Sequence, residues 1–505
     1  MRKWRYERSN SLRNKRSTFR AGQLPLDALL IDRDSPEPIQ RQLYAALRDL
    51  ILRRVLTPGL KLPSTRELSK RIMVSRNTVV RAYEQLDSEG YVETRQGSNT
   101  CVADLPLSPS SAIDDDSGKQ TGHLSNFGHA FDSLELPQFS VLHTALRPST
   151  PDVASFPFKT WNRLLGGNLL RQNFDLFNYN YPTGYPQLKK AIASYLQAYR
   201  GVRCEAHQIL ITNGAQSGLD LLSRVLLDRG DTVWMEEPGY DNARVLFSAA
   251  GAHIKPLHVT SSGWDLDRVP DGDIRLIYST PSCQAPLGLT MRMEQRLRLL
   301  EIAHRKGAWI IEDDFDSEYR LTGASIPAMQ GNDSFGRTIY IGTFAKTLFP
   351  AIRIGFVVLP RSIEPSVNRA AFYCGHQVSL PLQATLSDFI MSGHFARHLR
   401  RTRRLYAQRR EVFLELSRDL LGEWMEPFEA DVGIQVAFRF KRSFNDAAIA
   451  RRANELNLNV VPLSRYCHFS DPIRGLVFGY AALDESSMRT HLSTLVEIIR
   501  ASEGA

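Results

Sequence analysis

The sequence predicts an α/β protein with two parts, an N-terminal winged helix-turn-helix and a larger domain with a mostly parallel sheet and a smaller C-terminal lobe. The first part is predicted by three helical patterns that precede two short β-like runs. The second is predicted by apolar strands that alternate with helices, before a last hundred residues that are more helical. A chain of 505 residues is also too long for one ordinary core, which favours at least two domains.

Composition excludes several classes of protein. No apolar run reaches the roughly 18 residues that span a bilayer, so we expect no membrane segment and a cytoplasmic location. The cysteines lie far apart without a CxxC pair, which fits neither a zinc site nor a disulfide framework, and we expect reduced thiols and no metal. These are Cys101, Cys204, Cys283, Cys374 and Cys467.

The chain opens with a basic arm. Residues 1–20 hold eight Lys or Arg against one Glu and have no apolar period, so residues 1–34 are interpreted as an arm and lead-in without a fold of their own. Two interpretations stay open: a solubilising tail, or a segment that contacts nucleic-acid phosphates without sequence preference.

Residues 35–103 carry the signals of a winged helix-turn-helix. Apolar residues spaced by four predict a helix that begins at Pro38 and ends at residues 57–59. Ser64, with Glu67 three residues later, forms a capping box that predicts the start of a second helix. A third helix starts at Ser75 and is stopped by Gly90. Two short strands are then predicted at residues 91–95 and 100–103.

This region is also the basic part of the chain. Between Arg41 and Arg81 there are ten Lys or Arg and two acidic residues. A helix that opens with short donors and an arginine suits phosphates and base edges, and a glycine in the wing allows close approach to a backbone. The alternative is a small helical domain with a solvated basic face. The candidate DNA-binding residues are Arg66, Ser75, Arg76, Asn77, Thr78, Arg81 and Gly97.

Residues 104–138 are predicted to be a flexible linker, since they begin with a stretch rich in Ser, Asp, Pro and Gly. From residue 139 to 505 the pattern changes to buried strands that alternate with helices, which predicts the mostly parallel sheet. The predicted strands are residues 209–212, 232–235, 274–278, 309–311, 338–341 and 356–359.

Five features in this larger domain meet the needs of a pyridoxal phosphate site. A phosphate needs backbone N–H groups at a helix start and a cation, for which Gly214, Ala215, Gln216 and Arg353 are the candidates. The ring needs a flat partner, Tyr240, and its nitrogen needs a carboxylate, Asp313. Lys346 would form the imine (Schiff base) and is the candidate catalytic residue. Each residue alone has an ordinary structural interpretation, but their order and spacing together favour the site.

Both halves resemble known families. Residues 62–68 and 74–83, with Gly90-Tyr91-Val92, resemble the GntR-type winged helix, in which Arg66, Ser75, Arg76, Thr78 and Gly97 would contact DNA. The larger domain resembles the fold-type I aminotransferases, and the whole chain resembles the MocR/GabR-type regulators. The body motifs that carry this are residues 184–188, 212–216, 237–240, 280–282, 311–318, 342–350 and 394–398.

The resemblance implies more than the motifs themselves. The cofactor would be pyridoxal 5′-phosphate, the protein a homodimer, and Tyr181 a residue that reaches the partner's phosphate. The partners would be promoter double-stranded DNA and a small amino compound, or the cofactor itself, as effector. The location would be the bacterial cytoplasm, on the nucleoid when bound.

The sequence departs from the aminotransferase-like pattern near the expected pocket. The family usually has Tyr at Phe315, Ser at Ala345 and Thr or Ser at Leu287, and often His at Cys283 and an aromatic residue at Ala285. Three of these changes remove a hydroxyl. A hydrogen bond contributes about 0.5–1.5 kcal/mol net. At the upper end, the affinity for the cofactor is therefore expected to be weaker by an order of magnitude or more.

Two further features bear on the ligand. Aminotransferases hold the substrate carboxylate with an arginine near the C-terminus, but the strand-like residues 475–480 contain none, and Arg465 is the nearest candidate. Separately, residues 397–410 hold seven arginines and no acid. They are a solvated helix face, a second DNA-contacting surface or a docking surface for the head.

Three hypotheses for function follow. The first is a transcription regulator whose dimeric body holds the cofactor on Lys346 and whose DNA binding responds to an amino compound or the cofactor, with little or no transaminase turnover. The second is a working aminotransferase that also binds DNA. The third is a constitutive DNA-binding protein with a relic body.

Overall fold

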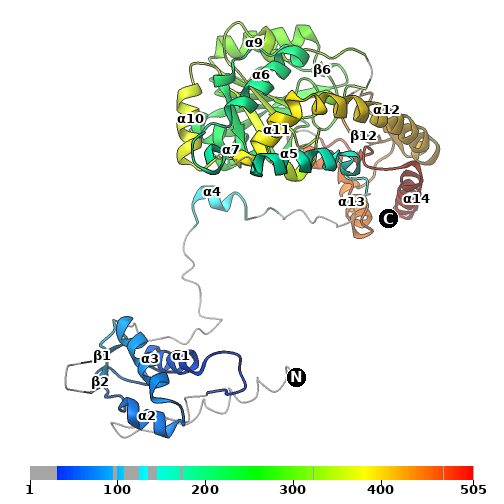
Figure 1. Ribbon diagram of the computed structural model, residues 1–505. Coiled ribbons are helices and arrows are strands. Elements are labelled where there is room, and N and C mark those ends of the chain that lie inside the picture. Colours follow the sequence, from blue (N-terminus) through cyan, green and yellow to red (C-terminus); the bar gives the residue numbers. More distant parts are fainter. Residues whose placement is uncertain are drawn as a thin grey trace. The chain divides into compact units, whose positions relative to one another are not determined.

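The computed structural model describes residues 31–94, 99–106, 124–132, 134, 145–170, 174–321, 323–430, 432–469 and 471–503. It divides into two compact units, Met1–Gly122 and His123–Ala505, called here the head and the body (Figure 1). Within the described residues, no helix is long and apolar enough to cross a membrane.

The head is the predicted winged helix-turn-helix. Leu43, Leu47, Leu68, Val79 and Leu86 are buried and join its helices into one core. The two strands pair antiparallel, with Val92 opposite Val102. Its elements are α1 (Ile39–Leu52), α2 (Thr65–Arg71), α3 (Arg76–Ser88), β1 (Val92–Thr94) and β2 (Thr100–Val102).

Local capping signals place two of the helix starts as predicted. The Ser64 hydroxyl accepts the N–H of Glu67 at 3.2 Å, and the Ser75 hydroxyl accepts that of Thr78 at 3.1 Å. The prediction that α1 runs to residues 57–59 was wrong. The helix ends at Leu52 because Arg54 takes a left-handed conformation (φ 54°) and the chain turns back. The carbonyl of Leu50 then accepts the N–H groups of Val55 and Leu56.

The body is built on an eight-stranded sheet with the order β3-β10-β9-β8-β7-β4-β5-β6. The pairs β9–β8, β8–β7, β7–β4 and β4–β5 are parallel, whereas β10 is antiparallel to both of its neighbours and β6 is antiparallel to β5. The sheet is therefore mostly parallel, as predicted. Its strands are β3 (Ile209–Thr212), β4 (Thr232–Glu237), β5 (His253–Thr260), β6 (Gly263–Trp264), β7 (Leu276–Ser279), β8 (Trp309–Asp314), β9 (Thr338–Thr343) and β10 (Gly355–Val358).

Helices surround this sheet (Figure 1). The short helix α4 lies within the span that was predicted to be linker, on the body side of the division between the two units. The helices before the C-terminal lobe are α4 (Asn126–His129), α5 (Phe158–Leu170), α6 (Pro186–Arg200), α7 (Ala215–Leu226), α8 (Asp241–Ala249), α9 (Met293–Lys306), α10 (Glu364–Tyr373) and α11 (Leu380–Met391).

The C-terminal lobe combines long helices with a second sheet. The sequence predicted its helical character and the strand at 475–480, but the rest of the four-stranded sheet, with the order β11-β12-β14-β13, was not predicted. Two of its strands have only three and two residues, too few to show an alternating pattern. The elements are α12 (His394–Leu421), β11 (Met425–Pro427), β12 (Gln435–Phe440), α13 (Asp446–Glu455), β13 (Val461–Pro462), β14 (Gly475–Gly479) and α14 (Glu485–Ala501).

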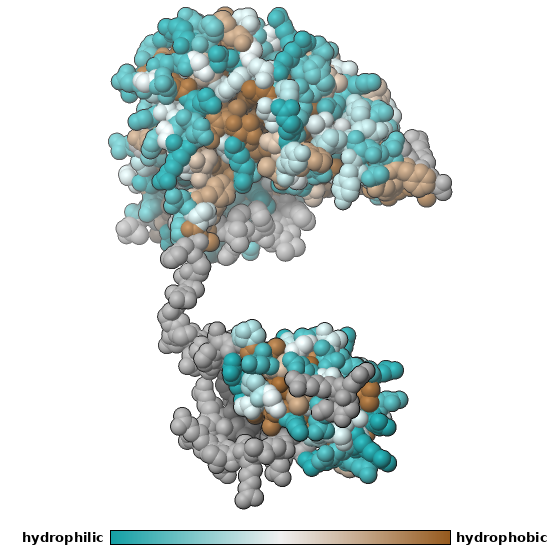
Figure 2. Space-filling view, turned by 90° about the vertical axis from the view of Figure 1, so that its left-hand side faces the viewer, coloured by the Kyte–Doolittle hydropathy of each residue, from teal (hydrophilic) through white to brown (hydrophobic). Residues whose placement is uncertain are grey.

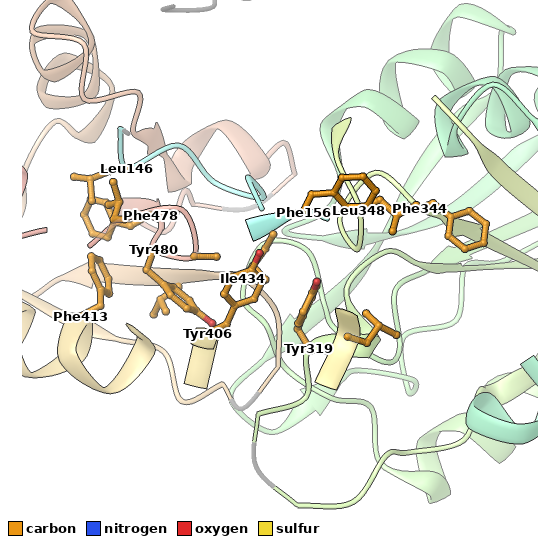
Figure 3. Close-up of a cluster of buried hydrophobic side chains, with 14 of the residues drawn as sticks. Leu146, Phe156, Tyr319, Phe344, Leu348, Tyr406, Phe413, Ile434, Phe478 and Tyr480 are labelled. Carbon is orange, nitrogen blue, oxygen red and sulfur yellow. The ribbon is translucent and has the colours of Figure 1, made fainter. Parts of the chain in front are cut away.

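One hydrophobic cluster joins this lobe to the large sheet (Figure 3). Tyr319, from the segment after β8, and Tyr406, from α12, have ring centroids 4.9 Å apart. Ile434 and Tyr480 of the C-terminal sheet are fully buried in the same cluster. The residues that follow β8 therefore belong to the junction between the large sheet and the C-terminal lobe.

Candidate functional site

The predicted cofactor residues meet at one edge of the large sheet. The carboxyl ends of β3, β4, β8 and β9 lie at this edge, together with the start of β10, since Gly355 pairs with both Thr212 and Thr343. Ligands of open α/β sheets bind outside the carboxyl ends of strands. The register therefore brings Gly214, Tyr240, Asp313 and Lys346 to the same edge of the sheet.

A helix start and an arginine form the anion-binding part of this edge. Gly214 is the N-cap of α7 in a conformation with φ 79°, which favours glycine. A Cβ atom on Gly214 would lie 3.8 Å from Cζ of Arg353, so the guanidinium lies beside the helix start. Within the described residues, Arg353 has neither an ion pair nor a hydrogen bond from its side chain. The free N–H groups of Ala215 and Gln216 and this cation suit a phosphate.

Tyr240 lies next to this cradle. It precedes α8 as its N-cap residue, and its hydroxyl accepts a hydrogen bond from Nδ2 of Asn242 at 3.1 Å. Burial raises the pKa of Tyr240 to about 12, so its ring stays neutral at physiological pH. The half-buried ring is therefore available as a flat, uncharged surface.

Asp313 has one oxygen bound and one free. It is only 4% exposed and accepts a hydrogen bond from the Tyr278 hydroxyl at 2.6 Å through Oδ2, while Oδ1 is buried without a partner in the described part of the chain. Burial raises the pKa of Asp313 to about 7. An unpaired oxygen on a buried carboxyl is costly, and a protonated ring nitrogen would satisfy it. Asp313 therefore fits the part predicted for it.

Lys346 follows β9 in a tight turn. Its Nζ donates to the carbonyl of Ser149 at 2.9 Å. Burial lowers the pKa of Lys346, the nearby Asp316 and Asp313 raise it, and Arg147 lowers it further. A lysine with a lowered pKa is more often the neutral amine that attacks a carbonyl carbon.

A buried ion pair fixes the strand end that carries Asp313. Asp314 accepts hydrogen bonds from Nε of Arg200 at 2.9 Å and from the Tyr340 hydroxyl at 2.6 Å, and both members of the ion pair are almost fully buried. The Arg200 charge holds the pKa of Asp314 below its usual range. Consecutive residues of a strand point to opposite faces, so this pair anchors one face of β8 while Asp313 serves the other.

Arg465 and Tyr181 lie at less enclosed places. Arg465 is 57% exposed and forms a 3.6 Å ion pair with Asp241, the residue after Tyr240. Tyr181 is half-buried, with its ring centroid 5.8 Å from that of Tyr185. Arg465 therefore lies beside the loop that carries Tyr240, but its guanidinium is paired there with the carboxylate of Asp241.

The residues that depart from the aminotransferase-like pattern fall into two groups. Leu287, Cys283 and Ala285 are buried, and Leu287 packs in a core cluster with Trp234. Phe315 and Ala345 are half-buried; Phe315 directly follows β8, which carries Asp313, and Ala345 directly precedes Lys346. The second group therefore has more direct access to a ligand than the first.

The predicted DNA-binding residues of the head lie at the exposed starts of α2 and α3. Arg66, Arg76 and Arg81 are exposed, and their side chains have no ion pair in the part of the chain that the structure describes. By contrast, Arg71 pairs with Glu67 and Arg53 with Asp49. Ser75 and Asn77 are exposed and Thr78 is half-buried, whereas Gly97 lies outside the described residues.

The arginine-rich start of α12 is mostly engaged within the body. Arg401 and Arg403 donate to the carbonyls of Ser155 and Glu318, and Arg409 forms a 2.8 Å ion pair with Asp152. Arg410 donates to the carbonyl of Ala430. These contacts favour a structural part for four of the seven arginines over a surface reserved for DNA.

Some site residues were missed by sequence reasoning. Ser149, Arg147 and Asp316 surround Lys346, and Tyr278 supports Asp313. Ser149 and Arg147 are remote in sequence from Lys346 and belong to no motif. Asp316 stood in the motif at residues 311–318, but nothing local distinguished it from Asp313 or Asp314.

Comparisons with known proteins agree with this geometry. Residues 39–102 match the family described as bacterial regulatory proteins, gntR family, and residues 162–471 match aminotransferase class I and II. A crystal structure of an archaeal alanine:glyoxylate aminotransferase, 23% identical, aligns with a TM-score of 0.67 over 75% of this chain and 96% of its own, which supports the fold of the body. A kynurenine aminotransferase from Pyrococcus horikoshii, 24% identical, aligns with a TM-score of 0.65 over 70% of this chain and 90% of its own.

Relatives that span both parts are regulators. The probable rhizopine catabolism regulatory protein MocR of Rhizobium meliloti is 46% identical over 94% of this chain and 97% of its own length. The pyridoxine biosynthesis regulator PdxR of Corynebacterium glutamicum is 30% identical over 92% and 96%. The chain therefore belongs to the MocR-like transcriptional regulators, in which a gntR-type DNA-binding domain is joined to an aminotransferase class I and II domain.

Proposed function

We propose that the body of this regulator binds pyridoxal 5′-phosphate on Lys346 and that an amino compound, or the cofactor itself, controls DNA binding by the head. The observation that carries the proposal is the free, buried Oδ1 of Asp313, at the sheet edge where Lys346 and Arg353 also lie. An effector acts only through its different affinity for two arrangements of the protein, so the bound amine must favour one of them.

Each pocket residue has a defined part in holding the cofactor. Gly214, Ala215 and Gln216 offer backbone N–H groups to the phosphate, and Arg353 offers its charge. Tyr240 packs on the ring, and Asp313 accepts the proton of the ring nitrogen. When bound, the cofactor supplies a carbonyl carbon that amines attack and a ring that withdraws electrons. The lowered pKa of Lys346 favours the neutral amine that this attachment needs.

A homodimer is supported by the exposed apolar residues of the body. Leu170, Phe174, Tyr179 and Tyr373 are each more than three-quarters exposed. A hydrophobic patch is also visible on one face of the body among hydrophilic surroundings (Figure 2). Exposed apolar surface of this kind marks interaction sites, and a second copy that covers it would bring Tyr181 near the partner's phosphate.

In the head, the three unpaired arginines are proposed to contact DNA. Arg66, Arg76 and Arg81 supply charge, and Ser75, Asn77 and Thr78 supply donors at the start of α3, with Gly97 in the wing. Phosphate contacts of this type position the protein, whereas base contacts give the sequence preference.

We propose that transaminase turnover is weak or absent. In the described residues the C-terminal strand β14 contributes no arginine, and Arg465 is already paired with Asp241. The intact Lys346 and Asp313 keep a second candidate function open, an aminotransferase that also binds DNA. Catalytic conversion of amino acids and oxo acids by the purified protein would favour that candidate.

The direct test is a spectrum. Purified protein is incubated with pyridoxal 5′-phosphate and its absorbance is recorded before and after reduction with borohydride, followed by identification of the modified peptide. We expect a visible absorbance band that reduction removes, and a cofactor adduct on Lys346. A protein that shows no such band would contradict cofactor binding and support a relic body.

A further inference from the structure

Asp316 is a second buried carboxylate at the pocket, and no part of the cofactor accounts for it. The residue is 0% exposed. Its Oδ2 accepts the backbone N–H of Ile434 at 3.0 Å, and its Oδ1 has no hydrogen-bond partner in the described part of the chain. Asp313 shares this half-satisfied state, but the ring nitrogen completes Asp313. Asp316 therefore lacks a donor.

The surroundings of Asp316 do not supply that donor. A Cβ atom on Gly433 would lie 3.2 Å from both Asp316 Oδ2 and Cys283 Sγ, so backbone and a weakly polar thiol press closely on this side. The carbonyl of Gly433 is itself occupied by the Tyr480 hydroxyl at 2.7 Å. Tyr319 and Ile434, which are close to Asp316 in the chain or bonded to it, belong with Tyr406 to the hydrophobic cluster at the lobe junction (Figure 3).

Among the described residues, the cation that lowers the pKa of Asp316 is Lys346, the residue proposed to hold the cofactor. The charge of Lys346 lowers the pKa of Asp316, while burial raises it to about 6, and Asp316 in turn raises the pKa of Lys346. The Nζ of Lys346 is directed to the carbonyl of Ser149 instead. An ionised carboxylate with one buried, unpaired oxygen is destabilised, so a ligand that brings a cation to Oδ1 gains an interaction that the described residues do not supply.

We propose that Asp316 is the recognition group for a second, cationic group of the effector, which makes the effector an amine that carries another basic group rather than a carboxylate. The inference rests on the proposed function, because the first amine must engage the cofactor held by Lys346. It agrees with the arginine-free strand β14 and with an Arg465 that is paired with Asp241. A ligand that ends in a carboxylate would meet Asp316 with like charge.

The position of Asp316 also gives this contact a consequence. Asp316 follows β8 of the large sheet, whereas Ile434 leads into β12 of the C-terminal lobe. A cation that binds Oδ1 keeps Asp316 ionised, and an ionised carboxylate is the stronger acceptor for the N–H of Ile434. Occupation of this subsite is thus expected to favour one arrangement of the two parts of the body, as an effector must.

The test compares amines that differ only at the far end. Full-length, cofactor-loaded protein is titrated with 1-aminobutane, 1,4-diaminobutane and 4-aminobutanoate, and with their homologues of three to six carbons, and binding is followed by absorbance and calorimetry. At the best chain length we expect the diamine to bind at least about tenfold more tightly than the monoamine, and the amino acid no better than the monoamine.

Asp316→Asn is the matching variant, because its amide oxygen can still accept the N–H of Ile434 while the charge is gone. We expect it to abolish the preference for the diamine but to keep binding of the monoamine, whereas Cys283→Ala, next to it, keeps the preference. If Asp316 only supports the lobe junction, Asp316→Asn will lower the unfolding midpoint without changing selectivity.

The outcomes separate this inference from the proposed function. A wild-type protein that responds to all three amines with equal affinity, or prefers 4-aminobutanoate, overturns the part given to Asp316 and leaves the sensor intact. A protein whose absorbance responds to no amine overturns amine sensing and this inference together. The selectivity of the wild type decides the matter even if the variant does not fold.

Discussion

The head and the body each place an unpaired arginine beside a helix start, but in different surroundings. Arg76 opens α3 on an exposed surface, together with other unpaired arginines. Arg353 lies beside the start of α7 and shares its sheet edge with the buried carboxylate of Asp313 and with Lys346. Both arginines are exposed, but an open basic surface binds a polyanion through many weak, salt-dependent contacts, whereas a cation beside a buried carboxylate and a lysine suits one small molecule.

The difference separates two tasks within one chain. In the proposed function, the head determines which nucleic-acid sites are bound, and the body determines when. In this proposal the body keeps the groups that would hold a cofactor, while Phe315, Ala345 and Leu287 stand where the aminotransferase-like pattern has hydroxyl groups. We therefore propose that Lys346 is a tether for a ligand more than a catalyst.

The largest expected effect is at Lys346. Lys346→Ala removes the side chain proposed to bond covalently to the cofactor, so we expect complete loss of the borohydride-sensitive absorbance band. Lys306→Ala, at the end of α9, serves as a control that should keep the band. A normal band in Lys346→Ala would contradict the assignment of the tether.

Next in size is the phosphate contact of the body. Arg353→Ala is expected to weaken cofactor binding by roughly ten- to a hundredfold, because hydrogen bonds to charged groups contribute about 1.5–3 kcal/mol. The dissociation constant of the cofactor, measured by absorbance titration, is the readout. An unchanged dissociation constant would indicate that the phosphate binds at another part of the sheet edge.

The corresponding change in the head is Arg76→Ala. Loss of one phosphate contact should weaken binding to any DNA by at most the factor expected for Arg353→Ala. It should also reduce the slope of log affinity against log salt concentration by about one unit. Arg71→Ala is the matched control, since Arg71 is paired with Glu67. Fluorescence anisotropy at several salt concentrations measures both, and equal losses in the two variants would contradict the proposed contact surface.

A smaller, opposite effect is expected at Phe315. Phe315→Tyr restores a hydroxyl near Asp313, and one added hydrogen bond of about 0.5–1.5 kcal/mol should tighten cofactor binding by about two- to tenfold. The variant is compared with the wild type by cofactor titration. Weaker binding would show that the half-buried Phe315 packs where a hydroxyl cannot be accommodated.

The smallest effect concerns the pH dependence of stability. Burial raises the pKa of Asp313 to about 7 in the folded protein, above the value of about 3.9 expected when unfolded. Its protonation therefore stabilises the cofactor-free protein below about pH 4, and this contribution is lost as the pH rises through 7. Relative to the wild type, Asp313→Asn should gain about 1 kcal/mol between pH 6 and pH 8.

Urea unfolding followed by tryptophan fluorescence measures this difference, because all tryptophans except Trp4 lie in the body. With cofactor bound, the ring nitrogen should keep Asp313 ionised. The stability of the wild type should then no longer fall, relative to Asp313→Asn, between pH 6 and pH 8. A difference that is independent of pH in the cofactor-free proteins would contradict the raised pKa.

How much the sequence revealed differs between the two regions. In the head, Ser64 and Ser75 act on N–H groups three residues away, so the helix starts were predictable from local signals. The end of α1 was not, because the left-handed turn at Arg54 has no glycine to announce it. In the body, the strands that place the pocket were predicted from runs of buried residues.

The pocket itself was predicted only where a motif carried it. Asp313, Lys346 and Arg353 stand in such motifs, and the sheet register brings their loops to one edge. Ser149 lies 197 residues before Lys346 in the chain and reaches it through its backbone carbonyl, which any residue type supplies. The difference between Asp313 and Asp316 likewise depends on which oxygens find partners, a property of packing and not of local sequence.

The central claim is that the body controls the head through Lys346. The most direct measurement is the affinity of the full-length protein for a DNA fragment selected from genomic fragments by binding, with and without pyridoxal 5′-phosphate, in the wild type and in Lys346→Ala. We predict that the cofactor changes the affinity of the wild type by at least about fivefold and leaves that of Lys346→Ala unchanged. Equal affinities under all conditions, or the same cofactor response in both proteins, would contradict the claim.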